Sequence, residues 1–536
     1  MASVREASFD FLRRQGMTTI FGNPGSTELP MLADFPEDFE YVLGLQESVV
    51  VGMADGFAQA SGRPTLANLH TAPGVGNAMG AIFNAMANKS PVVVTAGNQV
   101  RSLMTTQANL TNRDAVRMPQ ASVKWSFEPP RAADVPHALA RATHIASLPP
   151  RGPSFLSIPM DDWAAEADPA ITDFAINRSV NGNVGADPAA IAVLAKQLNG
   201  AANPAFVAGP EIDASGGWDA AVALAERLRL PVYASPAPGG GRLGFPENHP
   251  CFRGVLLPAV GPAGEMLAPH DFVLVVGAAV FSYYPNVPGP PLGENTRLTS
   301  ITNDPDEAAR AAIGDAILAD PRVALEQLLD ALGEGDDAGG RPELEPLPPA
   351  PAPEHSEPMQ PATAIDALAA VMPDDGIVVL EAPSATLAVR NRLRIGRPGS
   401  YFFGAGGGLG FGLPAAVGVQ LAQPDRPVIC VLGEGSAQYA IQAFWTAAAY
   451  EVPLTVLVLC NSEYSILKWF SAIESIERAP GLDLPALDVS AVAAGYGVRS
   501  DKAPDAAALR ELLAAAIADP APRLVEVAVA PGMAIF

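Results

Sequence analysis

The sequence predicts an α/β protein with three domains, each built on a doubly wound parallel sheet. Three observations lead to this prediction. The chain has 536 residues, which is too many for a single hydrophobic core. Short apolar strands alternate with helical segments in three blocks, and stretches rich in Pro, Gly and Asp separate the blocks. We therefore expect domains over residues 1–165, 185–332 and 362–536, with a Pro-rich linker over 333–361.

The first block alternates helix and strand signals. Residues 5–16 form an amphipathic pattern that ends at a glycine, which predicts a helix, and residues 18–26 read as a strand running into a turn. Two short apolar runs, 65–70 and 91–97, predict buried strands. Between them, residues 74–90 are mostly small and predict a helix. The order of these elements favours a parallel sheet.

The later blocks repeat this organisation after a predicted linker over residues 168–188. Residues 74–97 and 408–433 also share a pattern, in which a G-x-G is followed by a helix of small residues, a proline and a buried strand that ends in glycine. The first and third blocks are therefore expected to be versions of one fold, although αβ units in general often look like this.

The composition excludes some classes of function. The formal net charge of −24 argues against a nucleic-acid partner, because phosphate backbones bind basic surfaces. The three cysteines form neither a disulfide framework nor a zinc-binding spacing, and Cys430 and Cys460 lie in apolar runs that predict buried thiols. No apolar run is long enough for a membrane span, and the first residues lack a signal core. We expect a soluble cytoplasmic protein with no membrane partner.

A glycine turn closes on a carboxylate after a predicted buried strand. The stretch is LGEGSAQY, residues 432–439, and it follows the apolar run PVICVL. A helix over 437–451 and a second strand ending near Asn461 are expected next. In such a βαβ unit the two strands run parallel, so Glu434 and Asn461 lie at the carboxyl ends of strands, where open α/β sheets bind ligands.

Two interpretations of this unit are open. Oxygen ligands from Glu434 and Asn461, with backbone N–H groups at Gly435 and Ser436, suit a Mg²⁺ ion that bridges a diphosphate. The alternative is a structural glycine turn with a solvated acid and a capping asparagine. The separation of GEG from CN by residues 436–459 favours the first interpretation. It resembles the thiamine diphosphate motif, in which GDG is followed at a similar distance by NN.

Beyond this motif, the chain resembles the thiamine diphosphate-dependent decarboxylases, benzoylformate decarboxylase in particular, along nearly its whole length. Long stretches that carry the resemblance include residues 13–48, 68–81, 398–416 and 444–453. The family implies pyrimidine-binding, central and diphosphate-binding domains. It also implies a homotetramer, a dimer of dimers, in which two subunits share each active site.

The resemblance assigns catalytic roles to three residues of the first block. Glu47 matches the glutamate that hydrogen-bonds the cofactor pyrimidine and so activates the cofactor for loss of its C2 proton. His70 matches an acid–base histidine, and Ser26 matches a hydroxyl that orients the substrate carboxylate. The residue types alone also permit a helix N-terminal acid, a structural histidine and a turn serine.

The resemblance also implies a cofactor site with a metal ion, Mg²⁺ or Ca²⁺. Leu409 matches the apolar residue that holds the cofactor bent, and Gly407 matches a carbonyl that contacts its aminopyrimidine. The implied metal ligands are Glu434, Asn461 and the backbone carbonyl of Glu463. The other implied cofactor contacts are Asn23, Pro24, Gly25, Ser384, Gly433, Gly435, Ser436, Tyr439 and Tyr464.

Several positions depart from the family pattern. In the motif, Glu434 replaces Asp and Cys460 replaces Asn, and Pro383 stands where the family has a hydroxyl. Tyr284 aligns with a second active-site histidine, and it is a poor proton shuttle near neutrality. In the expected substrate pocket, which also holds Phe403, Ile466 occupies a position that is small in benzoylformate decarboxylase. This bulk predicts a bias towards smaller or aliphatic 2-oxo acids.

The leading functional hypothesis is the non-oxidative decarboxylation of a 2-oxo acid to an aldehyde. A carboligase resembling acetolactate synthase is an alternative that uses the same cofactor, and the product, an aldehyde or a 2-hydroxyketone, would distinguish the two. A third alternative is a paralogue that has lost catalysis and acts as a binding or assembly protein. The retained Glu47, His70, Ser26 and Leu409 argue against it, and titration with thiamine diphosphate and Mg²⁺ would test it.

Overall fold

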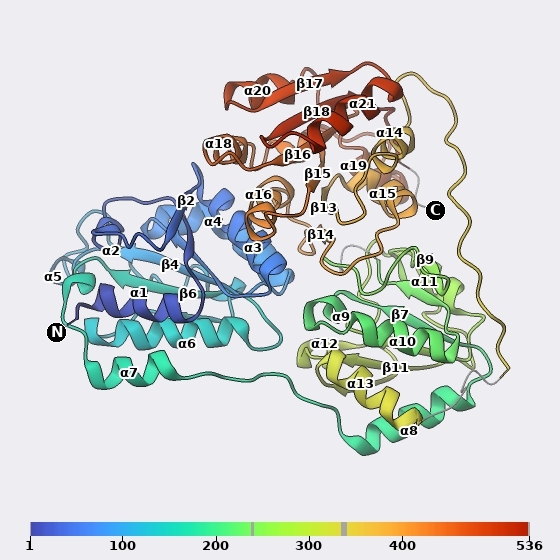
Figure 1. Cartoon of the computed structure of the whole chain (residues 1–536), viewed down its shortest axis with the longest axis horizontal. Coiled ribbons are helices and arrows are strands. Elements are labelled where there is room, and N and C mark those ends of the chain that lie inside the picture. Colours follow the sequence, from blue (N-terminus) through green and yellow to red (C-terminus); the bar gives the residue numbers. More distant parts are fainter. Residues whose placement is uncertain (1, 237–240, 334–339, 534–536) are drawn as a thin grey trace.

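The computed structural model describes residues 2–236, 241–333 and 340–533. Figure 1 shows three α/β bodies, with the N-terminal domain in blue, the central domain in green and the C-terminal domain in orange and red. Each is built on a sheet of six strands, and every strand pair in the three sheets is parallel. The predicted fold class is therefore confirmed. Over the described ranges, no helix combines the length and the hydropathy that crossing a bilayer requires.

The N-terminal sheet has the strand order β2-β1-β3-β4-β6-β5. Its central strands are buried along their whole length, as expected of a parallel sheet covered by helices on both faces. Its elements are α1 (Val4–Arg14), β1 (Thr19–Gly22), α2 (Leu29–Leu32), β2 (Glu40–Leu43), α3 (Glu47–Ser61), β3 (Thr65–Leu69), α4 (Thr71–Ala87), β4 (Val92–Asn98), α5 (Arg101–Met104), β5 (Trp125–Phe127), α6 (Val135–Ser147), β6 (Ser154–Pro159) and α7 (Pro169–Asn177).

The central sheet has a different order, β12-β11-β10-β7-β8-β9. Read from its other edge, this is the order of a dinucleotide-binding doubly wound fold. Its elements are α8 (Pro188–Gly200), β7 (Pro204–Ala208), α9 (Pro210–Ser215), α10 (Trp218–Leu228), β8 (Val232–Ala234), β9 (Phe252–Val255), α11 (Val260–Leu267), β10 (Phe272–Val276), β11 (Arg297–Thr302), α12 (Pro305–Arg310), β12 (Asp315–Leu318) and α13 (Pro321–Leu332).

The C-terminal sheet, β14-β13-β15-β16-β18-β17, repeats the strand order of the N-terminal sheet. The expectation that the first and third blocks share one fold is therefore confirmed. Its elements are α14 (Pro361–Ala369), β13 (Ile377–Glu381), α15 (Thr386–Leu393), β14 (Tyr401–Phe403), α16 (Gly412–Ala422), β15 (Val428–Gly433), α17 (Glu434–Ala437), α18 (Ala443–Ala449), β16 (Leu454–Cys460), α19 (Ser465–Ile473), α20 (Val489–Gly495), β17 (Arg499–Ala503), α21 (Ala506–Ile517) and β18 (Arg523–Ala528).

Helices α3 and α16 join the N- and C-terminal domains (Figure 1). Glycines let the two backbones approach closely: a Cβ on Gly56 would lie 2.2 Å from the carbonyl oxygen of Ala415, and one on Gly418 would lie 2.0 Å from that of Met53. Around this contact, buried side chains of both domains, such as Val50 and Val417, form one continuous hydrophobic cluster. The two domains therefore share a core.

The central domain has hydrophobic clusters of its own and meets its neighbours mainly through charged groups. Lys89 of the N-terminal domain lies within ion-pair distance of Glu211, Asp304 and Glu307. Burial opposes the charge of Lys89, but the three carboxylates outweigh it and raise the pKa of the amine.

Further polar links tie the central domain to the C-terminal domain. Asp213 accepts a hydrogen bond from Gly399 N at 3.0 Å, and Glu247 pairs with the buried Arg390 at 2.7 Å. Trp218 and Leu243 add an apolar contact, since they pack in a cluster made mostly of C-terminal residues.

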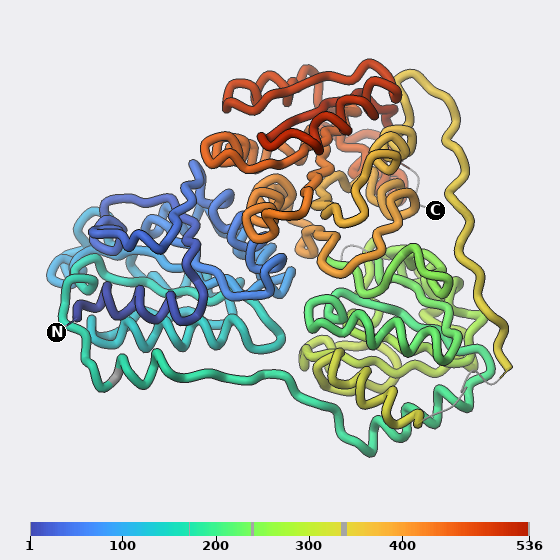
Figure 2. Tube along the Cα trace, viewed as in Figure 1, coloured from blue at the N-terminus to red at the C-terminus, as the bar shows by residue number. Residues whose placement is uncertain are grey.

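Two long connections run along the outside of the molecule (Figure 2). Residues 340–360 contain neither helix nor strand and lead from the central domain to α14. The start of the predicted Pro-rich linker, residues 334–339, lies outside the described residues. The other linker prediction, over 168–188, is wrong in its first half, because α7 forms there. Asp168 caps this helix by accepting a hydrogen bond from Ala170 N, and Pro169 is its first residue.

Two local predictions in the third block are also wrong. The helix expected over 437–451 is shorter than predicted, because α18 covers only Ala443–Ala449 and turns separate it from α17, which ends at Ala437. Cys430 is buried as predicted, but Cys460 is only partly buried because it lies at the last residue of β16.

The contact between α3 and α16 yields a stability prediction. Gly56→Ala should destabilise the protein by about 1–3 kcal/mol, because the new methyl group meets backbone atoms that cannot move aside. The matched control is Gly80→Ala in α4, where a Cβ would have no neighbour within 4 Å. Thermal unfolding should show a lower melting temperature for Gly56→Ala only. Equal melting temperatures for the two variants would contradict the prediction.

Candidate functional site

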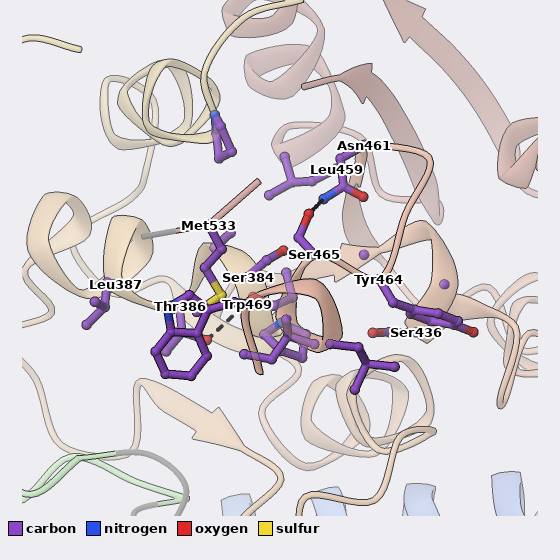
Figure 3. A pocket seen from close by; sticks show the side chains of 18 of the residues that line it. Ser384, Thr386, Leu387, Ser436, Leu459, Asn461, Tyr464, Ser465, Trp469 and Met533 are labelled. Atoms are coloured by element: carbon purple, nitrogen blue, oxygen red, sulfur yellow. Dashed lines mark hydrogen bonds between the residues drawn. The ribbon is translucent and has the colours of Figure 1, made fainter. Parts of the chain in front are cut away.

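A cavity of about 580 Å³ opens at the carboxyl ends of β13, β15 and β16 (Figure 3). Its walls come from the central and C-terminal domains. It brings together every site residue predicted in those domains: Tyr284, Ser384, Phe403, Gly407, Leu409, Gly433, Glu434, Gly435, Ser436, Tyr439, Asn461, Glu463, Tyr464 and Ile466.

Glu434 lies directly after β15 and is the first residue of α17. Its side chain is buried, and Oε1 accepts hydrogen bonds from the backbone N–H groups of Asn461, at 2.9 Å, and Ser462, at 2.6 Å. The extra methylene of Glu, compared with Asp, gives the carboxylate this reach. Burial raises the pKa of Glu434, and the backbone donors partly offset that effect.

The amide of Asn461 is oriented by two hydrogen bonds. Nδ2 donates to Ser465 Oγ at 2.8 Å, which Figure 3 shows as a dashed line, and Oδ1 accepts from Glu463 N at 3.2 Å. The Glu463 carboxylate is turned to other partners, since it pairs with Lys468 and accepts a hydrogen bond from Gly532 N. Glu463 therefore has its backbone carbonyl, rather than its side chain, to offer a metal.

These residues fit a hard divalent cation. They supply one carboxylate and neutral oxygens, the donor types that Mg²⁺ and Ca²⁺ prefer. The described part of the chain has no group of three or more His, Cys, Asp and Glu side chains that could hold a metal. A metal at Glu434 would therefore need amide and carbonyl oxygens as its other protein ligands. Gly435 leaves room for a ligand beside these oxygens, because a Cβ there would lie 2.7 Å from the ring of Tyr464, which also lines the cavity.

One wall of the cavity is apolar and aromatic. Tyr284 stacks on Phe470 with ring centroids 4.9 Å apart and an angle of 29° between the planes. Ile466 is the second residue of α19, the helix that also carries Phe470. Phe403 is the last residue of β14. Phe470 was not predicted as a pocket residue, although its spacing of four from Ile466 on one helix was a usable signal.

The site residues predicted in the N-terminal domain form a separate group. Asn23, Pro24, Gly25 and Ser26 follow β1, and Ser26 is exposed. Gly25 lies against the ring of His70, since a Cβ on it would be 2.0 Å from Nδ1.

Glu28 holds this group together and was missed in the sequence. Its buried carboxylate places Oε2 2.8 Å from His70 Nδ1, and it accepts hydrogen bonds from Gly25 N and Gly97 N, both at 2.8 Å. Thr27 Oγ1 donates to Oε1 at 2.7 Å. The partners of Glu28 come from the ends of β1 and β3 and from β4, which are far apart in the chain. The only signal in the sequence was the position of this acid two residues after Ser26.

Glu47 is the first residue of α3 and is buried. Asn77 of α4 donates a hydrogen bond to its Oε2 at 2.9 Å, and a Cβ on Gly74 would lie 3.1 Å from Oε1. Asn77 was also missed, because it stands among small residues of a helix whose pairing with α3 the sequence does not show.

The two groups do not meet within one chain. Among the described residues that line the cavity, none precedes Pro236, so Ser26, Glu47 and His70 contribute nothing to its walls. The cavity carries the features expected for a metal and a diphosphate, and the N-terminal group carries those expected for acid–base chemistry.

Both groups lie in segments that match domain models of one enzyme family. Residues 2–118 match the N-terminal TPP binding domain of thiamine pyrophosphate enzymes, residues 191–328 match their central domain, and residues 384–527 match their C-terminal TPP binding domain. A benzoylformate decarboxylase of Pseudomonas aeruginosa is 50% identical over 98% of this chain and 99% of its own length. The chain belongs to the thiamine pyrophosphate enzyme family.

Other family members show the same relation at lower identity. The thiamine diphosphate-dependent 4-hydroxybenzoylformate decarboxylase of Rhodococcus jostii superposes with a TM-score of 0.96 at 44% identity, covering 99% of this chain and all of that one. The acetolactate synthase isozyme 3 large subunit of Escherichia coli is 27% identical over 90% of this chain and 86% of its own.

The geometry of Glu434 generates a binding prediction. Glu434→Ala should weaken the binding of thiamine diphosphate with Mg²⁺ by at least about 100-fold, because the only carboxylate of the predicted metal shell is removed. Glu434→Asp is the matched variant and should retain binding, since it keeps the charge. Isothermal titration measures both. An alanine variant with the parent affinity would refute the assignment.

Proposed function

We propose that the protein is a thiamine diphosphate- and Mg²⁺-dependent carboxy-lyase that converts a 2-oxo acid to an aldehyde and CO₂. The observation that carries this proposal is the cavity itself, in which Glu434, Asn461 and the Glu463 carbonyl lie beside Leu409 and an apolar wall. The benzoylformate decarboxylase relative at 50% identity supports the same reaction. A cytoplasmic location is part of the proposal and rests on the sequence alone.

Thiamine diphosphate, when bound, supplies a carbon nucleophile at C2 and an electron sink for the bond that breaks. The diphosphate and metal would be held by Glu434, Asn461 and the turn at Gly435. Glu47 would hold a proton against the pyrimidine. His70, fixed by Glu28, would hold or deliver a proton at the reacting carbon, and Ser26 would orient the substrate carboxylate.

The apolar wall would lower the hydration of the reacting carboxylate. A charged carboxylate loses solvation in such surroundings, which favours its departure as neutral CO₂. Ile466, Phe403 and the stacked rings of Tyr284 and Phe470 form this wall. Tyr284, which replaces a histidine of the family, is more than half exposed and packs with its ring, so a wall role suits it better than proton transfer.

The acetolactate synthase-like alternative is less favoured. Relatives with that name are 24–28% identical to this chain, against 50% for the decarboxylase. A non-catalytic role is also less favoured, because Glu28 and Asn77 support His70 and Glu47 in detail that a binding protein would not need. Identification of the product as an aldehyde or a 2-hydroxyketone distinguishes the decarboxylase hypothesis from the carboligase hypothesis.

The proposal includes an active site shared between two chains of a homotetramer. In one chain the N-terminal group lies apart from the cavity, and exposed apolar side chains flank both. Leu29 and Leu45 are 59% and 44% exposed beside the N-terminal group, while Tyr439 and Leu467 are 53% and 44% exposed at the cavity. Such exposure fits surfaces that a second copy covers.

Mixed variants test the shared site. Glu47→Gln and Glu434→Ala chains should each be inactive, but after reassembly together they should recover about a quarter of the parent activity, because half of the dimers carry one intact site. Decarboxylation of the preferred 2-oxo acid is the readout.

The control is a mixture of Glu47→Gln with His70→Ala. Both changes lie in the same half of the site, so no combination of these chains restores an intact site. Recovery in this control, or its absence in the first mixture, would count against sharing.

The wall also generates a substrate prediction. Ile466 narrows the cavity, so Ile466→Ala should raise kcat/KM for benzoylformate relative to a straight-chain 2-oxo acid by about 10- to 200-fold. Ile473→Ala is the matched control, because it truncates the same residue type on the same helix at a position that is not among the described lining residues of the cavity. If the parent already prefers benzoylformate and Ile466→Ala leaves that preference unchanged, the wall does not select the substrate.

A further inference from the structure

The loop between β14 and α16, residues 404–411, supplies part of the cavity wall. It contains five glycines, at positions 404, 406, 407, 408 and 410, and Gly407 and Gly410 have positive φ angles of 70° and 101°. Gly407 and Leu409 line the cavity from this loop. A backbone so rich in glycine has many alternative shapes, so contacts outside the loop must select the one observed.

Glu381 makes one such set of contacts. It is the last residue of β13 and is buried. Its Oε1 accepts hydrogen bonds from Gly410 N at 2.8 Å and Phe411 N at 3.0 Å, and its Oε2 accepts one from Gly412 N at 3.0 Å. Both carboxylate oxygens are therefore used to fix three consecutive amides, at the point where α16 begins and its dipole favours a negative charge.

Asn84 makes the second set from the opposite side. It lies on α4 in the N-terminal domain and is buried. Its Nδ2 donates to the Gly408 carbonyl at 2.8 Å, and its Oδ1 accepts from Gly408 N at 3.2 Å. Asn88, one turn later, accepts from Ala405 N at 2.8 Å. Leu409 thus stands between a residue clamped by Asn84 and three residues clamped by Glu381.

Neither Glu381 nor Asn84 lines the cavity among its described residues. Burial raises the pKa of Glu381 to about 7, against the opposing effect of its three backbone donors, so keeping this acid in the interior has a cost. An apolar side chain at this position would leave three backbone N–H groups without their acceptor, so the acid is kept for its contacts with the loop.

We propose that Glu381 and Asn84 are positioning residues that together hold the loop so that Leu409 and the Gly407 carbonyl face the cofactor. The inference rests on the proposed function, because it gives these loop atoms their roles toward thiamine diphosphate. Its consequence is that loss of either clamp misplaces the cofactor without removing any group that touches it.

The test measures the bound cofactor without a 2-oxo acid. Full-length Glu381→Ala and Glu381→Gln are loaded with thiamine diphosphate and Mg²⁺, and exchange of the C2 proton with deuterium is followed by quenching and NMR. Glu381→Ala should slow exchange by about 100-fold, since a displacement near 1 Å has effects of that size. Glu381→Gln keeps one acceptor oxygen, so its rate should lie between those of the parent and the alanine variant.

Two further variants keep the test decisive. Asn84→Ala should slow exchange in the same way and provides the answer if Glu381→Ala does not fold. Asp320→Ala is the matched control, because Asp320 is also a buried carboxylate that accepts a backbone N–H, from Val323 at 3.1 Å, at the start of a helix in the central domain. It should lower the melting temperature while leaving the exchange rate unchanged.

A purely structural role predicts a different result. Melting temperatures would then fall in the Glu381 and Asn84 variants while the folded, loaded fraction exchanged at the parent rate, and this outcome would overturn the proposal. The exchange measurement needs no substrate, so it is independent of the decarboxylase proposal. If that proposal is wrong, the parent and the variants still show the expected exchange rates, but the parent turns over no 2-oxo acid.

Discussion

The close approach of α3 and α16 is the contact on which the rest of the structure depends. Gly56 and Gly418 allow backbone to meet backbone, and the surrounding apolar side chains merge two domains into one core. Both helices lead directly to functional groups, since α3 begins at Glu47 and α16 follows the loop of Leu409. The geometry of each group is therefore fixed by the same rigid contact.

The two groups of functional residues use different physical means to keep polar atoms in place. At the cavity, backbone amides fix the carboxylate: the N–H groups of Asn461 and Ser462 donate hydrogen bonds to Glu434. In the N-terminal group, side chains contact one another, as Glu28 does with His70 and Asn77 with Glu47, and backbone N–H groups add to the hold on Glu28. Backbone amides hold a carboxylate without needing a cation, which leaves its charge for a ligand.

The sequence predicted the fold and the Glu434–Asn461 end of the cavity from local signals, whereas the rest of the cavity lining came from the family resemblance. Strand β15, the turn at Glu434 and the strand before Asn461 are each visible as short patterns, and parallel pairing brings their ends together. The residues missed, Glu28, Asn77 and Phe470, act through contacts between elements. Their partners are set by packing, which one sequence does not display.

The wrong predictions have similar causes. Apolar periodicity suggested one helix after Glu434, but turns separate α17 from α18. The stretch containing α7 was read as a linker because of its Asp, Pro and Gly content, although Asp168 and Pro169 are also a good helix start. The separation of the N-terminal group from the cavity was implied only by the family resemblance, through its shared active site, because short patterns do not show how whole domains pack.

The attachment of the central domain has an evolutionary consequence. This domain has its own core, and its links to the other two are mainly ion pairs and hydrogen bonds such as those of Lys89, Asp213 and Glu247. Mutations inside it reach the other two domains through these links and through the apolar contact of Trp218 and Leu243. The N- and C-terminal domains must change in step, whereas the central domain can diverge, or be exchanged between lineages, as a unit that preserves its outer contacts and the part of the cavity wall that it supplies.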